Sequence, residues 1–140
     1  MFHFTVERLG FLKRIPGLPQ VFDALLLLGT AVARPERLAA MEQVEAHGRL
    51  LEGIRLRPHR FGGTGFVGLH REIAHLHGNG LLDARVGFEE RDRWVGSGRA
   101  QPHHRIPQSP WVSFWIRGRT DIPAAQELLD TAAKIAARQD

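Results

Sequence analysis

The chain has 140 residues, of which 43% are hydrophobic and 24% charged, and this size and composition predict one globular domain. Cysteine is absent. Disulfides and thiolate metal sites are therefore excluded, and only His, Asp and Glu remain as strong metal ligands. A chain without cysteine also fits the reducing cytoplasm, where we expect the protein to reside.

The formal net charge is +4, and the basic charge is almost all arginine, since the only lysines are Lys13 and Lys134. An anion-binding face would explain this excess, and so would a genome-wide bias toward arginine. The arginines are scattered, without long basic runs or interleaved aromatic residues. We therefore do not expect nucleic acid as a partner.

The first third of the sequence predicts two helices. Residues 20–33 are apolar nearly all round, which favours a helix covered on most sides. This stretch is too short to cross a membrane, which takes ~20 residues, although a helix lying on a membrane surface is an alternative. Pro35 ends it and opens a second helix over residues 35–51. We expect residues 1–53 to form a helical segment that packs on a core at 54–140.

The middle of the chain predicts a meander of three or four short strands. Apolar residues alternate or cluster at 54–56, 66–69, 73–77 and 81–86. Asn79-Gly80, between the last two segments, is a strong hairpin signal. Short turns between strands imply antiparallel pairing.

The last third predicts a short helix over residues 89–97, a strong aromatic strand over 111–116 and a final helix capped by Asp121. That helix has one continuous apolar face. Together these elements predict an α+β fold of two layers, in which an antiparallel sheet of about 4–6 strands is covered on one face by helices.

Histidine marks the most promising region, because six of the eight histidines lie between His59 and His104. If residues 71–77 form a regular strand, Arg71, Ile73, His75 and His77 share one face, and Glu72, Ala74 and Leu76 share the other. Two imidazoles at this spacing can hold one metal ion, transfer protons around a substrate, or simply orient the turn by hydrogen bonding.

A second pair, His103-His104, lies in a loop bounded by prolines. Adjacent residues of an extended loop point apart, so we expect at most one of the two rings to face the site. His103, His104 or Asp83 could supply the third ligand that a metal needs. No HExxH pattern is present. We expect no cofactor, with a divalent metal held by His75 and His77 as the alternative.

Four segments resemble the luciferase-like domain, which fungal luciferases share with many bacterial proteins. They are "RPHRFGG", "REIAHLHGNGLLD", "GRAQPHHRIPQSPWVSFWIRG" and the helix "AAQELLDTAAKIA". The upstream stretch "LPQVFDALLLLGTAVARPERL" is similar to the leader of bacterial members. The fungal enzymes oxidise a hydroxylated pyrone with oxygen and without a cofactor, but fold and motif do not fix the substrate.

The resemblance and the histidine pattern lead to one main hypothesis, an oxygenase-like enzyme for a small enolic or aromatic molecule. His75, His77 and His104 would transfer protons, Arg71 would stabilise negative charge, and Glu72 would orient a histidine. Substrate contacts would come from His103, Trp111 and Arg99. The alternative is a non-catalytic binding module whose basic surface contacts an acidic partner or nucleic acid. The sequence does not set the oligomeric state.

Overall fold

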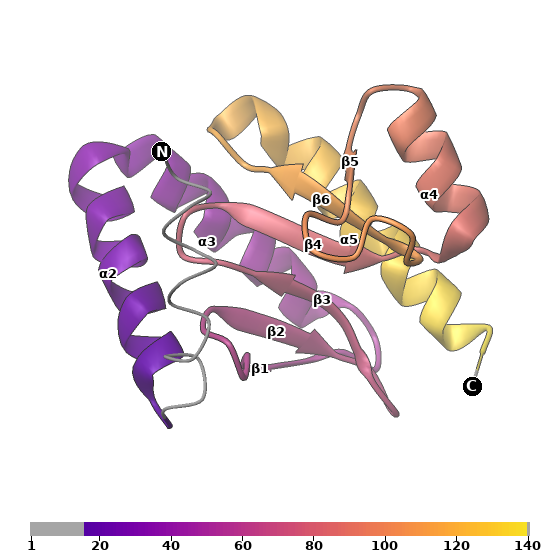
Figure 1. Cartoon of the computed structure of the whole chain (residues 1–140), viewed down its shortest axis with the longest axis horizontal. Coiled ribbons are helices and arrows are strands. Elements are labelled where there is room, and N and C mark those ends of the chain that lie inside the picture. The colour runs from indigo at the N-terminus through magenta and orange to yellow at the C-terminus, as the bar shows by residue number, and fades with distance from the viewer. Residues whose placement is uncertain (1–15, 140) are drawn as a thin grey trace.

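The computed structural model describes residues 16–139 and confirms the α+β fold. Two helices come first, followed by four strands, a helix, two more strands, a short 3-10 turn and a last helix (Figure 1). In chain order these are α2 (Leu18–Ala33), α3 (Pro35–Leu50), β1 (Arg55–Pro58), β2 (Thr64–Val67), β3 (Glu72–Leu76), β4 (Leu81–Arg85), α4 (Gly87–Gly96), β5 (Gln101–Pro102), β6 (Trp111–Trp115), η2 (Arg119–Asp121) and α5 (Ile122–Ala137).

The six strands form one sheet in the order β1-β2-β3-β4-β6-β5, and every neighbouring pair is antiparallel. The turn at Asn79-Gly80 joins β3 to β4, as the sequence predicts. Gly80 has a φ of +91°, which only glycine adopts readily, and its N–H donates to the carbonyl of His77 at 2.9 Å. The hairpin thereby brings the two strands that carry the first histidine pair and Asp83 side by side.

Helices α3 and α5 cover one face of the sheet (Figure 1). The apolar face predicted for the last helix is confirmed, because Ala125, Leu128, Leu129 and Ala132 are fully buried. They pack with α3 against a layer of strand residues: Phe66, Ile73, Ala74, Leu76, Leu82, Ala84, Val112, Phe114 and Ile116. With the core on one side, the opposite face of the sheet is left free for polar side chains.

Helix α2 is not covered on most sides, so that part of the prediction is wrong. Phe22, Leu25 and Val32 are largely exposed, and Thr30 is its one buried residue. The helix is held instead by polar contacts at its inner side, where Thr30 donates to the carbonyl of Gly78 at 2.9 Å and Asp23 accepts the Gly78 N–H at 2.7 Å. Among residues 16–139, no helix has the length and apolar character needed to cross a membrane. The division of the chain at residue 53 stays a prediction.

Asp121 precedes the last helix but does not cap it with its side chain, contrary to the prediction. Its carboxylate accepts the N–H groups of Arg117 at 2.7 Å and Gly118 at 3.3 Å. The reason is η2, which lies between the strand and the helix and turns Asp121 back toward the preceding residues.

The contact between α3 and the sheet provides a test of the core. Gly48 lies on α3 against the Phe66 ring, and a Cβ added there would overlap the ring, which is fully buried. We expect Gly48→Ala to destabilise the fold, because overpacking costs about 1–3 kcal/mol and exceeds the roughly 1 kcal/mol that alanine gains in a helix. Urea unfolding measures the difference.

Gly29→Ala is the matched control, since this helical glycine has no atom within 4 Å of an added Cβ. We expect it to stabilise the protein by up to about 1 kcal/mol. If both variants were equally stable, the close packing of α3 on Phe66 would be contradicted.

Candidate functional site

A polar row crosses the sheet on the face opposite α3 and α5. His75 on β3 pairs directly with Asp83 on β4, and Asp83 pairs with Ser113 on β6. Directly opposed residues of antiparallel strands share a face, so these three side chains lie side by side. His75 Nε2 lies 3.1 Å from Asp83 Oδ2, and the Ser113 hydroxyl donates to Asp83 Oδ1.

A β-bulge brings Glu72 onto the same face, which corrects the predicted alternation along this strand. Ala74 pairs with Phe66, but the next pair is Glu72 with Val67, so the register skips Ile73. The extra residue reverses the alternation. Ile73 therefore turns into the core, and Glu72 joins His75 on the polar face instead of opposing it.

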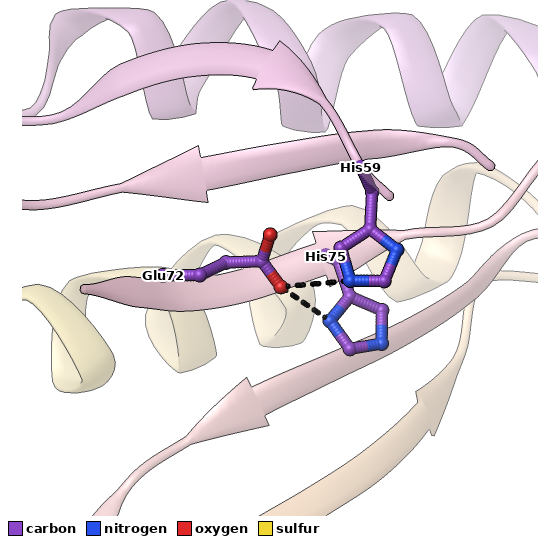
Figure 2. Close-up of side chains that lie close together, drawn as sticks. All are labelled: His59, Glu72 and His75. Atoms are coloured by element: carbon purple, nitrogen blue, oxygen red, sulfur yellow. Dashed lines mark hydrogen bonds and ion pairs between the residues drawn. The ribbon is translucent and has the colours of Figure 1, made fainter. Parts of the chain in front are cut away.

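Glu72 binds two imidazoles at once, as Figure 2 shows. Its Oε1 lies 2.9 Å from Nδ1 of His75 and 3.1 Å from Nε2 of His59, which comes from the loop after β1. Gly65, opposite His75 in the sheet, leaves the space, because a Cβ there would lie 2.6 Å from the Glu72 carboxylate. The two rings stack with their centroids 4.2 Å apart.

Both rings of the second histidine pair reach the site, so the expectation that at most one would face it is wrong. His103 Nε2 and His104 Nδ1 each lie 3.6 Å from Asp83 Oδ2, and the rings stack at 4.6 Å. The loop bends tightly instead of extending. The His103 Nδ1 accepts the N–H groups of Arg105 and Ile106, and the His104 N–H donates to the Ser113 hydroxyl at 3.3 Å.

We call this group the histidine cluster. It contains five imidazoles and two carboxylates: His59, Glu72, His75, His77, Asp83, His103 and His104. Asp83 lies at its centre with 0% of its surface exposed, and His77 Nε2 is a further 3.2 Å neighbour of Oδ2. His104 forms the open edge, since 44% of its side chain is exposed.

The charges in the cluster stabilise one another. Burial alone would raise the pKa of Glu72, but its hydrogen bonds to His59 and His75 outweigh burial and lower it to about 2. Burial lowers the pKa of His75, but hydrogen bonds to Asp83 and Glu72 outweigh that effect and raise it to about 9. The donors around Asp83 hold the pKa of that carboxyl well below its usual range despite burial. Without a metal, His75 is therefore an imidazolium between two carboxylates.

The pKa of His103 shifts in the opposite direction to that of His75. Its pKa is lowered, first by burial and then by the positive charges of the other histidines, which outweigh the attraction of Asp83. The cluster thus combines a ring that favours the charged form with one that favours the neutral form. Neighbouring groups whose environments push their pKa values apart are typical of sites that move protons.

The other predicted site residues divide into two groups. Trp111 lies against the cluster, with its ring centroid 5.5 Å from His75 and 6.1 Å from His103. Arg99 lies outside it, because its guanidinium binds Glu127 on α5 and stacks on the Trp94 ring at 4.0 Å. Within residues 16–139, the Arg71 side chain makes no hydrogen bond or ion pair with the cluster.

Two participants escaped the sequence prediction, His59 and Ser113. The available signal for Ser113 is a small polar residue inside an otherwise apolar and aromatic strand, and Asp83 interrupts an apolar strand in the same way. A polar residue in such a strand needs a partner. For His59 the signal is weaker, because the loop between β1 and β2 had to fold back before its ring could reach Glu72.

The cluster itself is closely packed. One hollow of the described surface lies beside β5 and β6, where Ser113 is part of its lining, and another lies between α2 and α3. Three groups of ligand atoms in the cluster lie within 4.8 Å of one another: His59, Glu72 and His75; His75, His77 and Asp83; and Asp83, His103 and His104. Such gaps suit protons or a metal ion at the centre, and an organic molecule only at the exposed edge.

The hydroxyl of Ser113 has a testable role. Ser113→Ala removes the donor to Asp83 Oδ1 and the acceptor for the His104 N–H. We expect a loss of about 1–3 kcal/mol in unfolding free energy, because a buried acceptor is left unsatisfied. Chemical denaturation of the purified variant measures it.

Ser109→Ala serves as the control. The Ser109 hydroxyl is buried but has no hydrogen-bond partner among residues 16–139, so its removal is expected to cost nothing. Equal losses in the two variants would contradict the role assigned to Ser113.

Comparison with known proteins identifies one family. Residues 70–132 match the family model of the Luciferase domain. The matched segment contains every residue of the cluster except His59. No curated protein and no solved structure matches the chain. The match agrees with the resemblance predicted from the sequence, and most of the histidine cluster lies within the segment that is similar to the Luciferase domain.

Proposed function

We propose that the chain is an enzyme that uses dioxygen to oxidise a small enolic or aromatic molecule at the histidine cluster. One observation carries the proposal: five imidazoles and two buried or half-buried carboxylates meet within and beside the segment that matches the Luciferase domain. Clusters in which these groups shift each other's pKa values are typical of catalytic sites.

The exposed edge of the cluster fits a flat, partly apolar substrate. His104 is the most exposed ring of the cluster, and the apolar side chains of Phe61 and Ile106 are exposed on the two loops that reach the cluster. The Phe61 ring touches His59 with 5.6 Å between centroids. A small ring carrying a hydroxyl group could pack on these apolar groups and present its O–H to an imidazole.

His104 is the best candidate for the base. Its ring is accessible, and Asp83, 3.6 Å from its Nδ1, stabilises the imidazolium that forms when it accepts a proton. The enol O–H bond breaks, and its proton passes to His104. The electron pair then forms a carbonyl, and the adjacent carbon gives two electrons to dioxygen as a C–O bond forms.

The outer oxygen atom takes the proton back from His104, so the product is a hydroperoxide and no external reductant is needed. The resulting negative charge requires a stabilising group while it exists. The sequence suggested Arg71, but the geometry favours His75 and His77, which lie in the cluster itself. Trp111 would form the wall beside these rings.

The alternative, a binding module with a basic surface, has weaker support. Two arginines are already paired with acidic residues: Arg93 binds Glu89 and Glu90, and Arg99 binds Glu127. These pairs neutralise part of the basic surface that an acidic partner would need.

Oxygen uptake tests the proposed reaction. The protein is incubated with a panel of hydroxylated pyrones and phenols in an oxygen electrode, with and without added divalent metal ions. We expect uptake above the protein-free rate for at least one compound. His104→Gln should lower that rate by about 100-fold or more, the usual contribution of a general base.

His47→Gln is the matched control. His47 also pairs with a carboxylate, 2.7 Å from Asp130, but that pair joins α3 to α5 on the other face of the sheet. Its rate should equal that of the wild type. Full activity in His104→Gln, or no uptake with any compound, would contradict the proposal.

A further inference from the structure

We infer that the centre of the cluster is a binding site for a divalent first-row transition metal ion, held by Nε2 of His75, Nε2 of His77 and Oδ2 of Asp83. The inference rests on the proposed function, because it places the ion where the substrate would react. Two histidines and one carboxylate with open positions are the ligand set typical of non-haem iron oxygenases, and imidazole with carboxylate also suits zinc, cobalt and manganese.

The separations of the two histidine nitrogens from the Asp83 oxygen match those between ligands of one ion. His75 Nε2 and His77 Nε2 lie 3.1 and 3.2 Å from Asp83 Oδ2, and each of the three residues offers a ligand atom within 4.8 Å of those of the other two. Bonds of about 2.0–2.2 Å to a metal at angles between octahedral and tetrahedral place neighbouring ligand atoms roughly 3.0–3.5 Å apart. An ion bound to Asp83 Oδ2 can therefore reach both nitrogens once the two rings adjust their separation.

The outer groups orient the ligands in the way metal sites require. Glu72 lies 2.9 Å from Nδ1 of His75, so this nitrogen can donate its N–H while Nε2 offers a lone pair to the ion. The Ser113 hydroxyl donates to Oδ1 of Asp83 and leaves Oδ2 directed toward the imidazoles. A metal-bound histidine almost always donates its second N–H to such an acceptor.

The same reasoning excludes two rings as ligands. Nδ1 of His103 accepts the N–H groups of Arg105 and Ile106, so the hydrogen of the neutral ring is on Nε2, which faces Asp83. Nδ1 of His59 accepts the N–H of Phe61, and its Nε2 donates to Glu72. His59 therefore donates a hydrogen bond to Glu72, and the Nε2–H of His103 faces Asp83 at 3.6 Å, so neither ring offers a lone pair to the ion.

His104 is different, because no backbone group occupies its nitrogens in the described part of the chain. It remains free to act as the base beside the ion. An ion in this position would bind the deprotonated oxygen of an enol and stabilise its negative charge as a Lewis acid. The cluster would thus divide into a metal-binding side and a proton-accepting edge.

Cobalt binding tests the inference directly. The full chain is treated with a chelator, dialysed and titrated with Co²⁺ in a calorimeter, and the visible absorption of the ion is recorded. We expect one tightly bound equivalent and the absorption bands of nitrogen and oxygen coordination, both displaced by Zn²⁺. His77→Gln and Asp83→Asn should weaken binding by more than about 10-fold, the loss typical of removing even an outer partner of a metal ligand.

His47→Gln, which changes the distant pair with Asp130, should bind like the wild type. If Asp83→Asn fails to fold because it alters a fully buried group, His77→Gln decides, since 21% of that side chain is exposed. The absence of bound ion at ~1 mM free Co²⁺ and Zn²⁺, or unchanged binding in His77→Gln, would overturn the inference. Equal losses in His103→Gln and His77→Gln would overturn the division of roles.

The outcome separates this inference from the proposed reaction. Tight metal binding without oxygen uptake would support the metal site and contradict the proposed reaction. Oxygen uptake by a chain that binds no metal ion would support the proposed reaction and contradict the metal site.

Discussion

Removing a carboxylate from water costs several kcal/mol unless opposite charges or hydrogen-bond donors replace the water, and Asp83 has no exposed surface. Asp83 lies in the centre of a sheet whose other face is apolar. The partners of its carboxylate must therefore be polar side chains on its own face of the sheet. The Ser113 hydroxyl donates a hydrogen bond to Oδ1 of Asp83, and four imidazoles surround Oδ2. This requirement connects β3, β4, β6 and the loop before β6, and the chemistry of the site follows from it.

The bulge in β3 lets one short strand serve two layers that need different spacings. The core requires Ile73, Ala74 and Leu76, whereas the polar face requires Glu72 and His75. Strict alternation cannot supply both sets, because residues 72 and 75 would then point to opposite faces. One extra residue solves the conflict, and such bulges are frequent beside functional sites.

Most of the architecture follows from local patterns, but the site depends on contacts that no local pattern encodes. The apolar face of α5 and the Asn79-Gly80 turn are predictable from residue spacing, and the resemblance to the luciferase-like domain rests on short motifs. The bulge at Ile73 was not predictable, since it arises from the pairing register with β2 and not from the spacing of residues within β3. Nor was the joint approach of His103 and His104, which depends on backbone N–H groups turned onto the His103 ring.

The exposure of helix α2 was also not predictable from local pattern. Its composition predicts a covered helix, but its contacts bind the turns beside the site. Asp23 and Thr30 bind both backbone polar groups of Gly78, immediately after His77. Gln20 donates to the carbonyl of Arg60 at 3.2 Å, next to His59. The helix approaches so closely that a Cβ at Gly78 would lie 2.7 Å from the carbonyl oxygen of Asp23. It thus holds the two turns that carry His59 and His77, whose ring centroids lie 6.4 Å apart, and one helix fixes the spacing of both turns.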